Sequence, residues 1–426
     1  MTAAAPSEPV LEAGTTVPRL PLLFLCHRIP YPPNKGDKIR ALHLLHHLAQ
    51  HFEVHLATFV DDPADWAFTA DVEKHCRSAI FAPLVPWRAT LRSARGLLTG
   101  EALTLPYYRD STLARRVEHT VREHAIRHAI VYSSAMAQYL PADVAFERRV
   151  VDFVDVDSDK WLQYAARKRW PLSWVYRREG QRLFEHERAV ARCFDAGLFV
   201  SATEAALFRR LAPEVAHCIG HFDNGVNAAY FAPDADHANP YPAGARVLVF
   251  TGAMDYWPNV DAVCWFAREV FPALRRINER LVFYIVGSSP SAEVQALASL
   301  AGVSVTGRVP DVRPYLAHAL AAVAPLRIAR GVQNKVLEAM AMERPVLVTG
   351  KGLEGIEALD GRHVLVAENP SDYARHVQAL LSGEHAGLGD CARELVRTRF
   401  AWEACLPEVV TLLAGGRECH ARRSGE

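Results

Sequence analysis

Short apolar runs alternate with amphipathic segments along nearly the whole chain. This alternation is typical of βα units that build a parallel sheet. Between the first two runs, Ile39, Leu42, Leu45 and Leu48 recur at helical spacing and predict a connecting helix. In the first half, the runs predict strands at LPLLFLC (20–26), FEVHLATFV (52–60), HAIVYSS (128–134), RVVDFVDV (149–156) and AGLFVSA (196–202).

The segment 221–244 interrupts this pattern with Asn, Asp, Gly and Pro, as expected of an interdomain linker. The alternation then restarts with six further predicted strands: ARVLVFTGAM, RLVFYIVGSS, GVSVTGRV, AAVAPLR, RPVLVTG and RHVLVAE. We therefore predict a disordered leader (1–18), a first Rossmann-like domain (19–222), a second Rossmann-like domain (223–398) and a closing helix with a tail (399–426). Two such domains bring the carboxyl ends of their strands to a shared cleft, where open α/β sheets bind ligands.

Composition narrows the class of protein. With 426 residues, of which 50% are hydrophobic, the chain is long enough for two cores. Lys and Arg together number 48 and balance 48 Asp and Glu, so no excess of positive charge indicates nucleic acid as a partner. The eight cysteines form no C-x-x-C pair, which argues against a structural zinc site and fits a reducing compartment.

Neither a signal peptide nor an apolar run of about 18 residues is present in this sequence. We expect a cytoplasmic protein, either soluble or peripheral at the inner membrane.

The stretch GVQNKVLEAMAMERPVLV (331–348) combines a glycine, a helix start and two charged side chains one turn apart. A helix N-terminus attracts phosphate, and Lys335 would add a positive charge there. Glu338, on a similar face, can accept hydrogen bonds from two ribose hydroxyls. This reading indicates a nucleotide site, but the stretch taken alone favours a surface ion pair beside a buried helix face, because helical charge pairs at this spacing are common.

Four motifs occur in order in the second half: DNGVNAAYF, FTGAM, IVGSS followed by VTGRVPDVRPYL, and NKVLEAMAMERPVLV. Together they resemble the C-terminal half of glycosyltransferase family 4 across residues 221–410. More narrowly, CHRIPYPPNKGDKIR, VDFVDVDSDKW and GAMDYWPNVDAV are similar to sugar transferases associated with exosortase (PEP-CTERM) and exopolysaccharide loci.

The resemblance implies an α/β fold of GT-B type, with two doubly wound Rossmann-like domains facing a central cleft and a C-terminal helix that closes back. It implies a metal-independent, retaining hexosyltransferase without a cofactor. Such an enzyme moves sugar from a nucleotide-diphosphate donor to a saccharide or lipid-linked saccharide in exopolysaccharide synthesis. A nucleotide-sugar epimerase and a non-catalytic nucleotide-sugar-binding protein of the same fold stay open. A dehydrogenase is disfavoured because G-x-G-x-x-G follows the first strand of neither domain.

The resemblance also assigns donor-binding roles. Glu338 would hold the ribose, Gly252 and Gly331 would lie against the diphosphate, and Lys335 would neutralise it as a catalytic cation. The remaining implied donor contacts are Gly307, Arg308 and Val309 around the base and Gly36 from the opposite domain.

Two positions depart from the family pattern. Arg330 stands where the family commonly has a second glutamate that contacts the donor sugar. TGAMDYWPNV lacks the Arg and Lys that often follow its glycine, so Arg327, Arg330 or Lys335 must carry the phosphate charge.

In the first domain, DFVDVDSD (152–159) ends a predicted strand. We expect Asp155 to face the cleft near the reacting sugar. A turn-capping role and metal ligation through the Asp155-x-Asp157 pair are the alternatives. His27 is a further catalytic candidate, with a structural role as its alternative, and Lys35 and Lys38 are predicted to meet an acceptor phosphate.

The segment 161–192 interleaves tryptophans with many arginines and lysines. Such a segment suits an anionic membrane surface or a lipid-diphosphate acceptor. A solvated helical hairpin whose aromatic residues pack on the first domain is the alternative.

Overall fold

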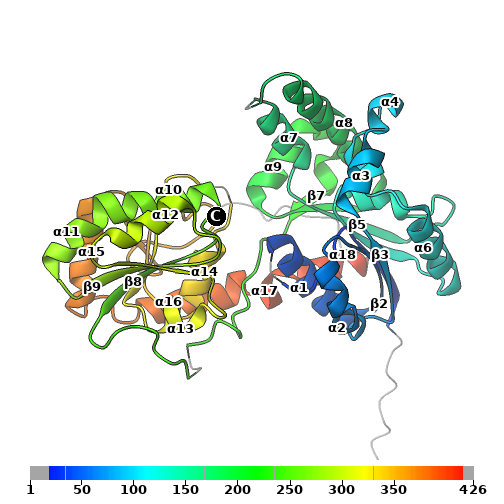
Figure 1. Cartoon of the computed structure of the whole chain (residues 1–426). Helices are drawn as coiled ribbons and strands as arrows, with labels where there is room; N and C mark the ends of the chain where they lie inside the picture. The colour runs from blue at the N-terminus through cyan, green and yellow to red at the C-terminus, as the bar shows by residue number, and fades with distance from the viewer. Residues whose placement is uncertain (1–18, 34, 167, 234–235, 330, 416–426) are drawn as a thin grey trace, which may run out of the picture.

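The computed structural model describes residues 19–33, 35–166, 168–233, 236–329 and 331–415, which form two α/β domains (Figure 1). The first domain contains a seven-stranded sheet in the order β3-β2-β1-β4-β5-β6-β7, and the second a six-stranded sheet in the order β10-β9-β8-β11-β12-β13. All paired strands in both sheets are parallel. The predicted pair of doubly wound domains is confirmed. The predicted leader, residues 1–18, lies outside the described residues.

The first sheet contains the five predicted strands and two that the sequence did not reveal. Its strands are β1 Pro21–Cys26, β2 Glu53–Val60, β3 Ser78–Pro83, β4 His128–Tyr132, β5 Arg148–Val154, β6 Ala196–Phe199 and β7 Ile219–His221. The missed strands β3 and β7 lie at the two edges of the sheet. β3 is a short apolar run, SAIFAP, that is only partly buried and ends in Pro83, and β7 has only three residues.

The second sheet contains all six predicted strands. They are β8 Arg246–Thr251, β9 Leu281–Val286, β10 Val303–Gly307, β11 Ala321–Ala324, β12 Val346–Val348 and β13 Leu365–Val366. The inner strands β8, β11 and β12 are almost wholly buried and read as apolar runs, whereas the edge strands β10 and β13 are less fully buried.

Helices cover both faces of each sheet (Figure 1). In the first domain they are α1 Gly36–His51, α2 Thr69–Glu73, α3 Pro86–Ser93, α4 Gly96–Thr99, α5 Thr104–Tyr107, α6 Ser111–Glu123, α7 Asp157–Ala166, α8 Leu172–Cys193 and α9 Ala202–Leu211. The later helices are α10 Trp257–Trp265, α11 Phe271–Ile277, α12 Ala292–Ala296, α13 Arg313–Ala317, α14 Asn334–Ala341, α15 Pro370–Leu381, α16 Leu388–Leu395, α17 Trp402–Cys405 and α18 Pro407–Leu413. Side-chain caps fix several starts: Asp110 accepts from two amides at the start of α6, and Asn369 does so at α15.

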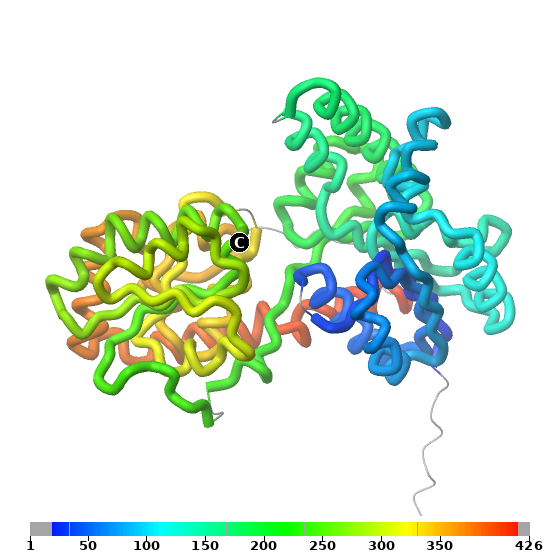
Figure 2. The backbone as a smooth tube through the Cα atoms, in the orientation of Figure 1, coloured from blue at the N-terminus to red at the C-terminus, as the bar shows by residue number. Residues whose placement is uncertain are grey.

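The last two helices return to the first domain. Trp402, Leu406, Val409 and Leu413 join the hydrophobic cluster that lies on one face of the first sheet. Figure 2 shows this red segment running from the second domain back along the first. The chain therefore crosses between the domains twice.

The two crossings lie side by side. The amide of Val226 in the first crossing donates a hydrogen bond to the carbonyl of Phe400 in the second crossing at 2.7 Å. A Cβ on Gly225 would stand 2.6 Å from the indole of Trp402, so only glycine lets the two strands approach this closely.

A fully buried ion pair joins the first crossing to the sheet. Arg40 of α1 donates to Asp152 of β5 at 2.8 Å, and both side chains are 0% exposed. The same guanidinium donates to the carbonyl of Phe222 at 3.1 Å and to Oδ1 of Asn224 at 3.0 Å. It also lies 3.5 Å over the ring of Phe222. One side chain thus connects a helix, a central strand and the linker.

Removing one partner of this pair should strongly destabilise the first domain. Asp152→Ala leaves a buried guanidinium unpaired, which costs about 3–5 kcal/mol of unfolding free energy. The double variant Arg40→Met/Asp152→Leu should recover much of that loss. Urea denaturation measures both, and a single variant as stable as the parent would contradict the assigned importance of the pair.

Two histidines, the half-buried His43 and the buried His55, should make the fold sensitive to acid. Burial lowers the pKa of His43, which stacks on Trp402 at 4.8 Å, to about 4, and burial likewise lowers that of His55 to about 4. Unfolded histidine titrates near pH 6.5, so the unfolded state takes up more protons below that pH.

The contribution of these two histidines to stability should therefore decrease as the pH is lowered from ~6.5 to ~4, and it should stay constant below pH ~4. Thermal unfolding across this range measures the effect, and the double variant His43→Phe/His55→Phe should flatten the slope. An unchanged slope in that variant would show that other groups govern the acid response.

Candidate functional site

Two cavities lie at the carboxyl ends of the strands. The interdomain cavity measures about 830 Å³ and is lined from the first domain and linker by Gly36 and Asn224. From the second domain its lining includes Thr251, Gly252, Ala253, Tyr256, Val286, Gly287, Ser288, Arg308, Val309, Val312, Val332, Gln333, Asn334, Lys335 and Glu338. The first-domain cavity measures about 600 Å³ and lies under helices α7 and α8.

Helix α14 supplies two charged groups of the interdomain cavity, Lys335 and Glu338, beside Arg308 from the loop after β10. Val336, Leu337 and Met340 are buried in the core, whereas Lys335 and Glu338 are partly buried and line the cavity. The ammonium of Lys335 donates to Oδ1 of Asn259 at 2.6 Å. These two residues therefore line the interdomain cavity, which does not support the alternative of an ion pair on the outer surface.

Burial favours the uncharged form of both side chains and so shifts the pKa of each. It lowers the pKa of Lys335 to about 8, a shift that Glu338 opposes. It raises the pKa of Glu338 to about 7, a shift that Lys335 opposes. An anion placed beside Lys335 would stabilise its charged form, so the site is prepared for a negatively charged ligand.

Glycines form the wall opposite α14. A Cβ on Gly287, after β9, would stand 1.6 Å from the carbonyl oxygen of Gly252, after β8. At Gly252 itself φ is +156°, and a Cβ there would stand 2.8 Å from the amide nitrogen of Asn259. The loops can pack this closely only without side chains, and they leave backbone exposed to a ligand.

Three of the other predicted donor contacts, Gly36, Arg308 and Val309, also line the interdomain cavity. Arg308 and Val309 line the cavity, and Gly307 directly precedes them with φ +70°. Gly331 also has φ +70° and lies three residues before α14. Gly36 lines the cavity from the start of α1, in the opposite domain.

One of the predicted phosphate cations, Arg327, does not line the interdomain cavity. Arg327 pairs with Asp261 at 2.5 Å on the outside of α10, which does not support its predicted donor role. Arg330 lies outside the described residues.

Asn259 is a site residue that the sequence reading missed. Its side chain is buried, donates to the carbonyl of Ala253 at 2.9 Å and accepts from Lys335. It thereby holds the Lys335 ammonium near the loop after β8, where TGAMDYWPNV itself supplies no Lys or Arg. The available signal was an asparagine within a helix start, which alone does not indicate a ligand contact.

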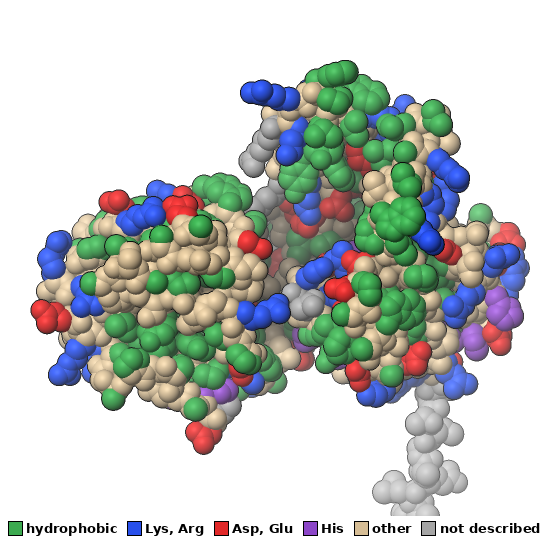
Figure 3. Space-filling model, viewed as in Figure 1, with side chains coloured by type: hydrophobic (Ala, Val, Ile, Leu, Met, Phe, Trp, Pro, Cys, Tyr) green, Lys and Arg blue, Asp and Glu red, His purple; other side chains and the backbone are tan. Residues whose placement is uncertain are grey.

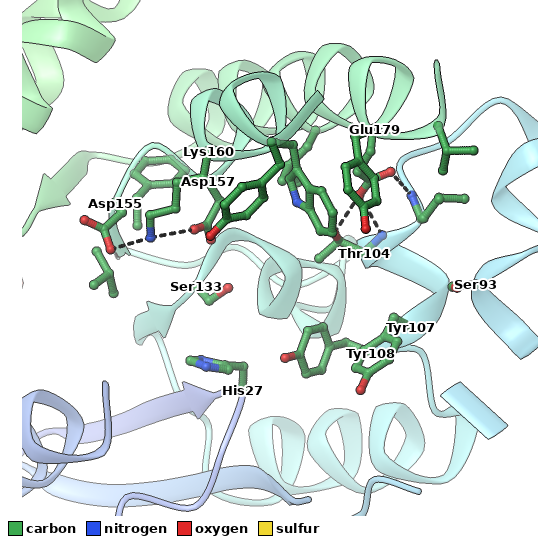
Figure 4. Close-up of a pocket in the computed structure, with 18 of the residues that line it drawn as sticks. His27, Ser93, Thr104, Tyr107, Tyr108, Ser133, Asp155, Asp157, Lys160 and Glu179 are labelled. Atoms are coloured by element: carbon green, nitrogen blue, oxygen red, sulfur yellow. Dashed lines mark hydrogen bonds and ion pairs between the residues drawn. The ribbon is translucent and has the colours of Figure 1, made fainter. Parts of the chain in front are cut away.

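The first-domain cavity collects polar groups from the ends of β1, β4 and β5 (Figure 4). Lys160 donates to Asp155 at 2.6 Å and to Asp157 at 3.2 Å. Burial lowers the pKa of Lys160, but the two carboxylates outweigh it and raise that pKa above its ordinary value. Asp155 therefore faces the first-domain cavity and forms an ion pair with Lys160.

Backbone strain marks this cavity. Ser133 after β4 and Val154 at the end of β5 have φ of 76° and 70°, although neither is glycine, and both line the cavity. Such conformations cost roughly 1–3 kcal/mol each and concentrate at functional sites. Asp152 holds both: its carbonyl accepts from the Ser133 amide at 2.8 Å and its side chain from the Val154 amide at 3.1 Å.

His27 lies on the floor of this cavity. Its ring stacks on Tyr132 with centroids 5.6 Å apart, and its Nε2 lies 3.6 Å from the carboxylate of Asp37. Asp37 lines this cavity and its neighbour Gly36 lines the other, so the two cavities adjoin at the start of α1.

Of the two predicted acceptor lysines, Lys38 fits this site poorly. Lys38 is only 2% exposed and pairs with Asp65 at 2.5 Å, so its predicted contact with an acceptor phosphate is not supported. Lys35 is exposed at the start of α1 and is free of that constraint.

A wall of aromatic and hydroxyl-bearing side chains completes the first-domain cavity. It includes Thr90, Ser93, Thr104, Tyr107, Tyr108, Trp161, Tyr164 and Tyr176. The buried carboxylate of Glu179 accepts from the amide and the hydroxyl of Thr104, at 3.0 and 2.6 Å, and so ties α8 to α5 (Figure 4).

Comparisons with known proteins agree with this architecture. Residues 245–383 match the family model described as Glycosyl transferases group 1. No curated protein sequence matches the chain.

Solved structures resemble nearly the whole chain. A sucrose-phosphate synthase from Thermosynechococcus elongatus has a TM-score of 0.67 and 19% identity, over 93% of this chain and 99% of its own. WaaG, a glycosyltransferase involved in lipopolysaccharide biosynthesis, has a TM-score of 0.61 and 16% identity, over 93% and 100%. Anabaena HepE in complex with UDP-glucose has a TM-score of 0.59 and 13% identity, also over 93% and 100%. The chain thus has the fold of the GT-B glycosyltransferases, and its second domain matches the group 1 family of glycosyl transferases.

Proposed function

We propose that this protein is a glycosyltransferase that moves a hexosyl unit from a nucleotide-diphosphate sugar to a saccharide or lipid-linked saccharide acceptor. The observation that carries the proposal is the placement of Lys335 and Glu338 on the wall of the interdomain cavity, at the start of α14. This helix lies within the segment that matches group 1 glycosyl transferases.

The donor would be bound by complementary groups. The free amides at the start of α14 and the ammonium of Lys335 suit a diphosphate, and the carboxylate of Glu338 suits the hydroxyls of a ribose. The binding of UDP-glucose by HepE makes a uridine nucleotide the first donor to test.

The acceptor would be bound in the first-domain cavity. Its polar end carries Asp37, Asp155 and Asp157 against one lysine, Lys160, together with His27. Carboxylates accept hydrogen bonds from sugar hydroxyls and repel phosphate, so this end fits the hydroxyl groups of a saccharide. A phosphate on the acceptor would lie outside this end, on the side of the exposed Lys35.

Catalysis by such a site would consist of positioning and electrostatic stabilisation. Negative charge grows on the diphosphate as the sugar bond breaks, and Lys335 would stabilise that charge. The proposal also includes retention of configuration at the transferred sugar and independence of metal ions. It further includes membership of glycosyltransferase family 4 and a role in exopolysaccharide synthesis of the exosortase-associated type. These rest on the sequence resemblance, whereas a cytoplasmic position, peripheral at the inner membrane, rests on the unpaired pattern of the cysteines and on the tryptophans and cations of segment 161–192.

An epimerase is the rival with a clear experimental signature. It would convert the nucleotide sugar without any acceptor, whereas a transferase needs a second substrate in the adjoining cavity. Incubating the protein with UDP-glucose, GDP-mannose or ADP-glucose and analysing free nucleotide sugars by chromatography distinguishes the two.

Replacing Lys335 should affect turnover more than donor binding, because charge that develops in the transition state gains most from it. We expect Lys335→Ala to lower the rate at saturating donor by about 100-fold or more. Lys335→Arg should restore little, since a planar guanidinium does not reproduce a compact ammonium. The exposed Lys351→Ala serves as control. A near-parental rate in Lys335→Ala would refute the assignment.

Nucleotide affinity should peak between about pH 7 and pH 8. Below pH 7 Glu338 becomes protonated and accepts hydrogen bonds poorly, while above pH 8 Lys335 loses its charge. Calorimetric titration of UDP from pH 6 to 9 tests this expectation. Glu338→Gln should weaken UDP binding about 10-fold, as expected when one partner of a buried hydroxyl is lost, and should remove the acidic limb. Retention of that limb in the variant would assign it to another group.

A further inference from the structure

Exposed apolar side chains are concentrated on four helices of the first domain. Leu98 of α4 is 90% exposed, and Trp170, between α7 and α8, is 81% exposed. In Figure 3 the hydrophobic side chains gather over this upper part of the first domain, above a hollow that contains acidic and basic groups. The set comprises Val85, Trp87, Leu91, Leu97 and Leu98 on the α3–α4 side and Leu162, Tyr164, Trp170, Leu172 and Trp174 on the α7–α8 side.

These two sides form one continuous surface. Arg178 of α8 donates to the carbonyl of Gly96 at 2.6 Å and to that of Glu101 at 3.2 Å. The first-domain cavity lies between the two helical pairs, since residues of α3 and of both α7 and α8 line it. We call the ten apolar residues and the cations around them the apolar rim.

The charges of the apolar rim have a single sign. Residues 85–100 and 161–178 contain no Asp or Glu. Exposed cations on the described part of these segments are Arg88, Arg95, Lys168, Arg169 and Arg177. None of these five forms an ion pair with another described residue.

We propose that the apolar rim is a docking surface for an anionic lipid bilayer. Tryptophan and leucine enter the interface between headgroups and acyl chains, and surrounding arginines and lysines are attracted to anionic headgroups. A second copy of the chain fits this surface less well, because the same cations would face each other across the contact.

Docking would place the mouth of the first-domain cavity at the bilayer. No described helix is both long and apolar enough to cross a membrane, so the contact is a surface contact. An acceptor anchored in the bilayer could then present its saccharide to the cavity. This consequence for the acceptor rests on the proposed function, whereas lipid binding itself does not.

Sedimentation with lipid vesicles tests the proposal on the full chain. We expect binding to phosphatidylcholine vesicles that contain about 30% phosphatidylglycerol, and much weaker binding to pure phosphatidylcholine or at about 0.5 M salt. Leu91→Ser/Leu98→Ser and Trp170→Ser/Trp174→Ser should each reduce the partition coefficient at least about tenfold. The α3–α4 pair is decisive, because the sequence segment 161–192 alone does not predict its effect.

Matched variants separate a specific surface from general stickiness. Ile277→Ser/Leu359→Ser removes exposed apolar groups from the second domain and should leave vesicle binding unchanged. Arg88→Gln/Arg95→Gln/Arg169→Gln should weaken binding at low salt by roughly 100-fold. Thermal unfolding and UDP binding of every variant show whether the fold and the donor site are intact.

The outcomes distinguish the two proposals. Lack of binding to the anionic vesicles, or an unchanged partition coefficient in Leu91→Ser/Leu98→Ser, overturns the docking surface even if UDP binds. Vesicle binding without UDP binding would leave the surface standing and count against the proposed donor. Concentration-dependent dimerisation that the same serine variants abolish, without vesicle binding, would assign the surface to a second copy.

Discussion

The buried contact between Arg40 and Asp152 is the interaction on which the rest of the architecture depends. It fixes α1 against the centre of the first sheet and, through Phe222 and Asn224, fixes the point where the chain leaves the first domain. Asp152 also holds the strained residues at the ends of β4 and β5. Because α1 begins at the junction of the two cavities, a single ion pair sets the position of both. A buried pair of this kind adds little net stability compared with apolar residues, but it specifies one arrangement.

The two cavities differ in their electrostatics, and the difference suits two substrates. At the interdomain cavity, backbone amides, glycine loops and Lys335 suit a diphosphate, and Glu338 is the carboxylate available for hydroxyls. At the first-domain cavity, carboxylates outnumber cations and aromatic rings form the walls. The carboxylates of the first-domain cavity repel an anionic ligand, whereas the positive charge of Lys335 attracts one to the interdomain cavity. The adjoining start of α1 is where a donor sugar and an acceptor hydroxyl could meet.

Side chains around the first-domain cavity connect it to the outer surface of the same helices. Glu179 and Arg178, neighbours on α8, tie that helix to α5 and to the segment around α4, respectively. A Cβ on Gly180 would stand 2.8 Å from Leu162, so α7 and α8 pack closely. Trp170 and Trp174 of the same helical pair remain exposed. The helices that line the cavity on one side thus carry the apolar rim on the other.

The sequence by itself determined the two parallel sheets, the linker between them and the cavity-facing helix at 334–341. Buried central strands and helices carry periodic apolar patterns that are readable without any tertiary contact. It did not reveal the edge strands β3 and β7, whose burial depends on neighbours. Tertiary structure alone decided that Lys38 pairs with Asp65 and Arg327 with Asp261, that Asn259 holds Lys335, and that α3 and α4 join α7 and α8 in one surface. The reason is that a charged or polar side chain takes whichever partner the fold brings within hydrogen-bonding distance, and that partner is distant in sequence.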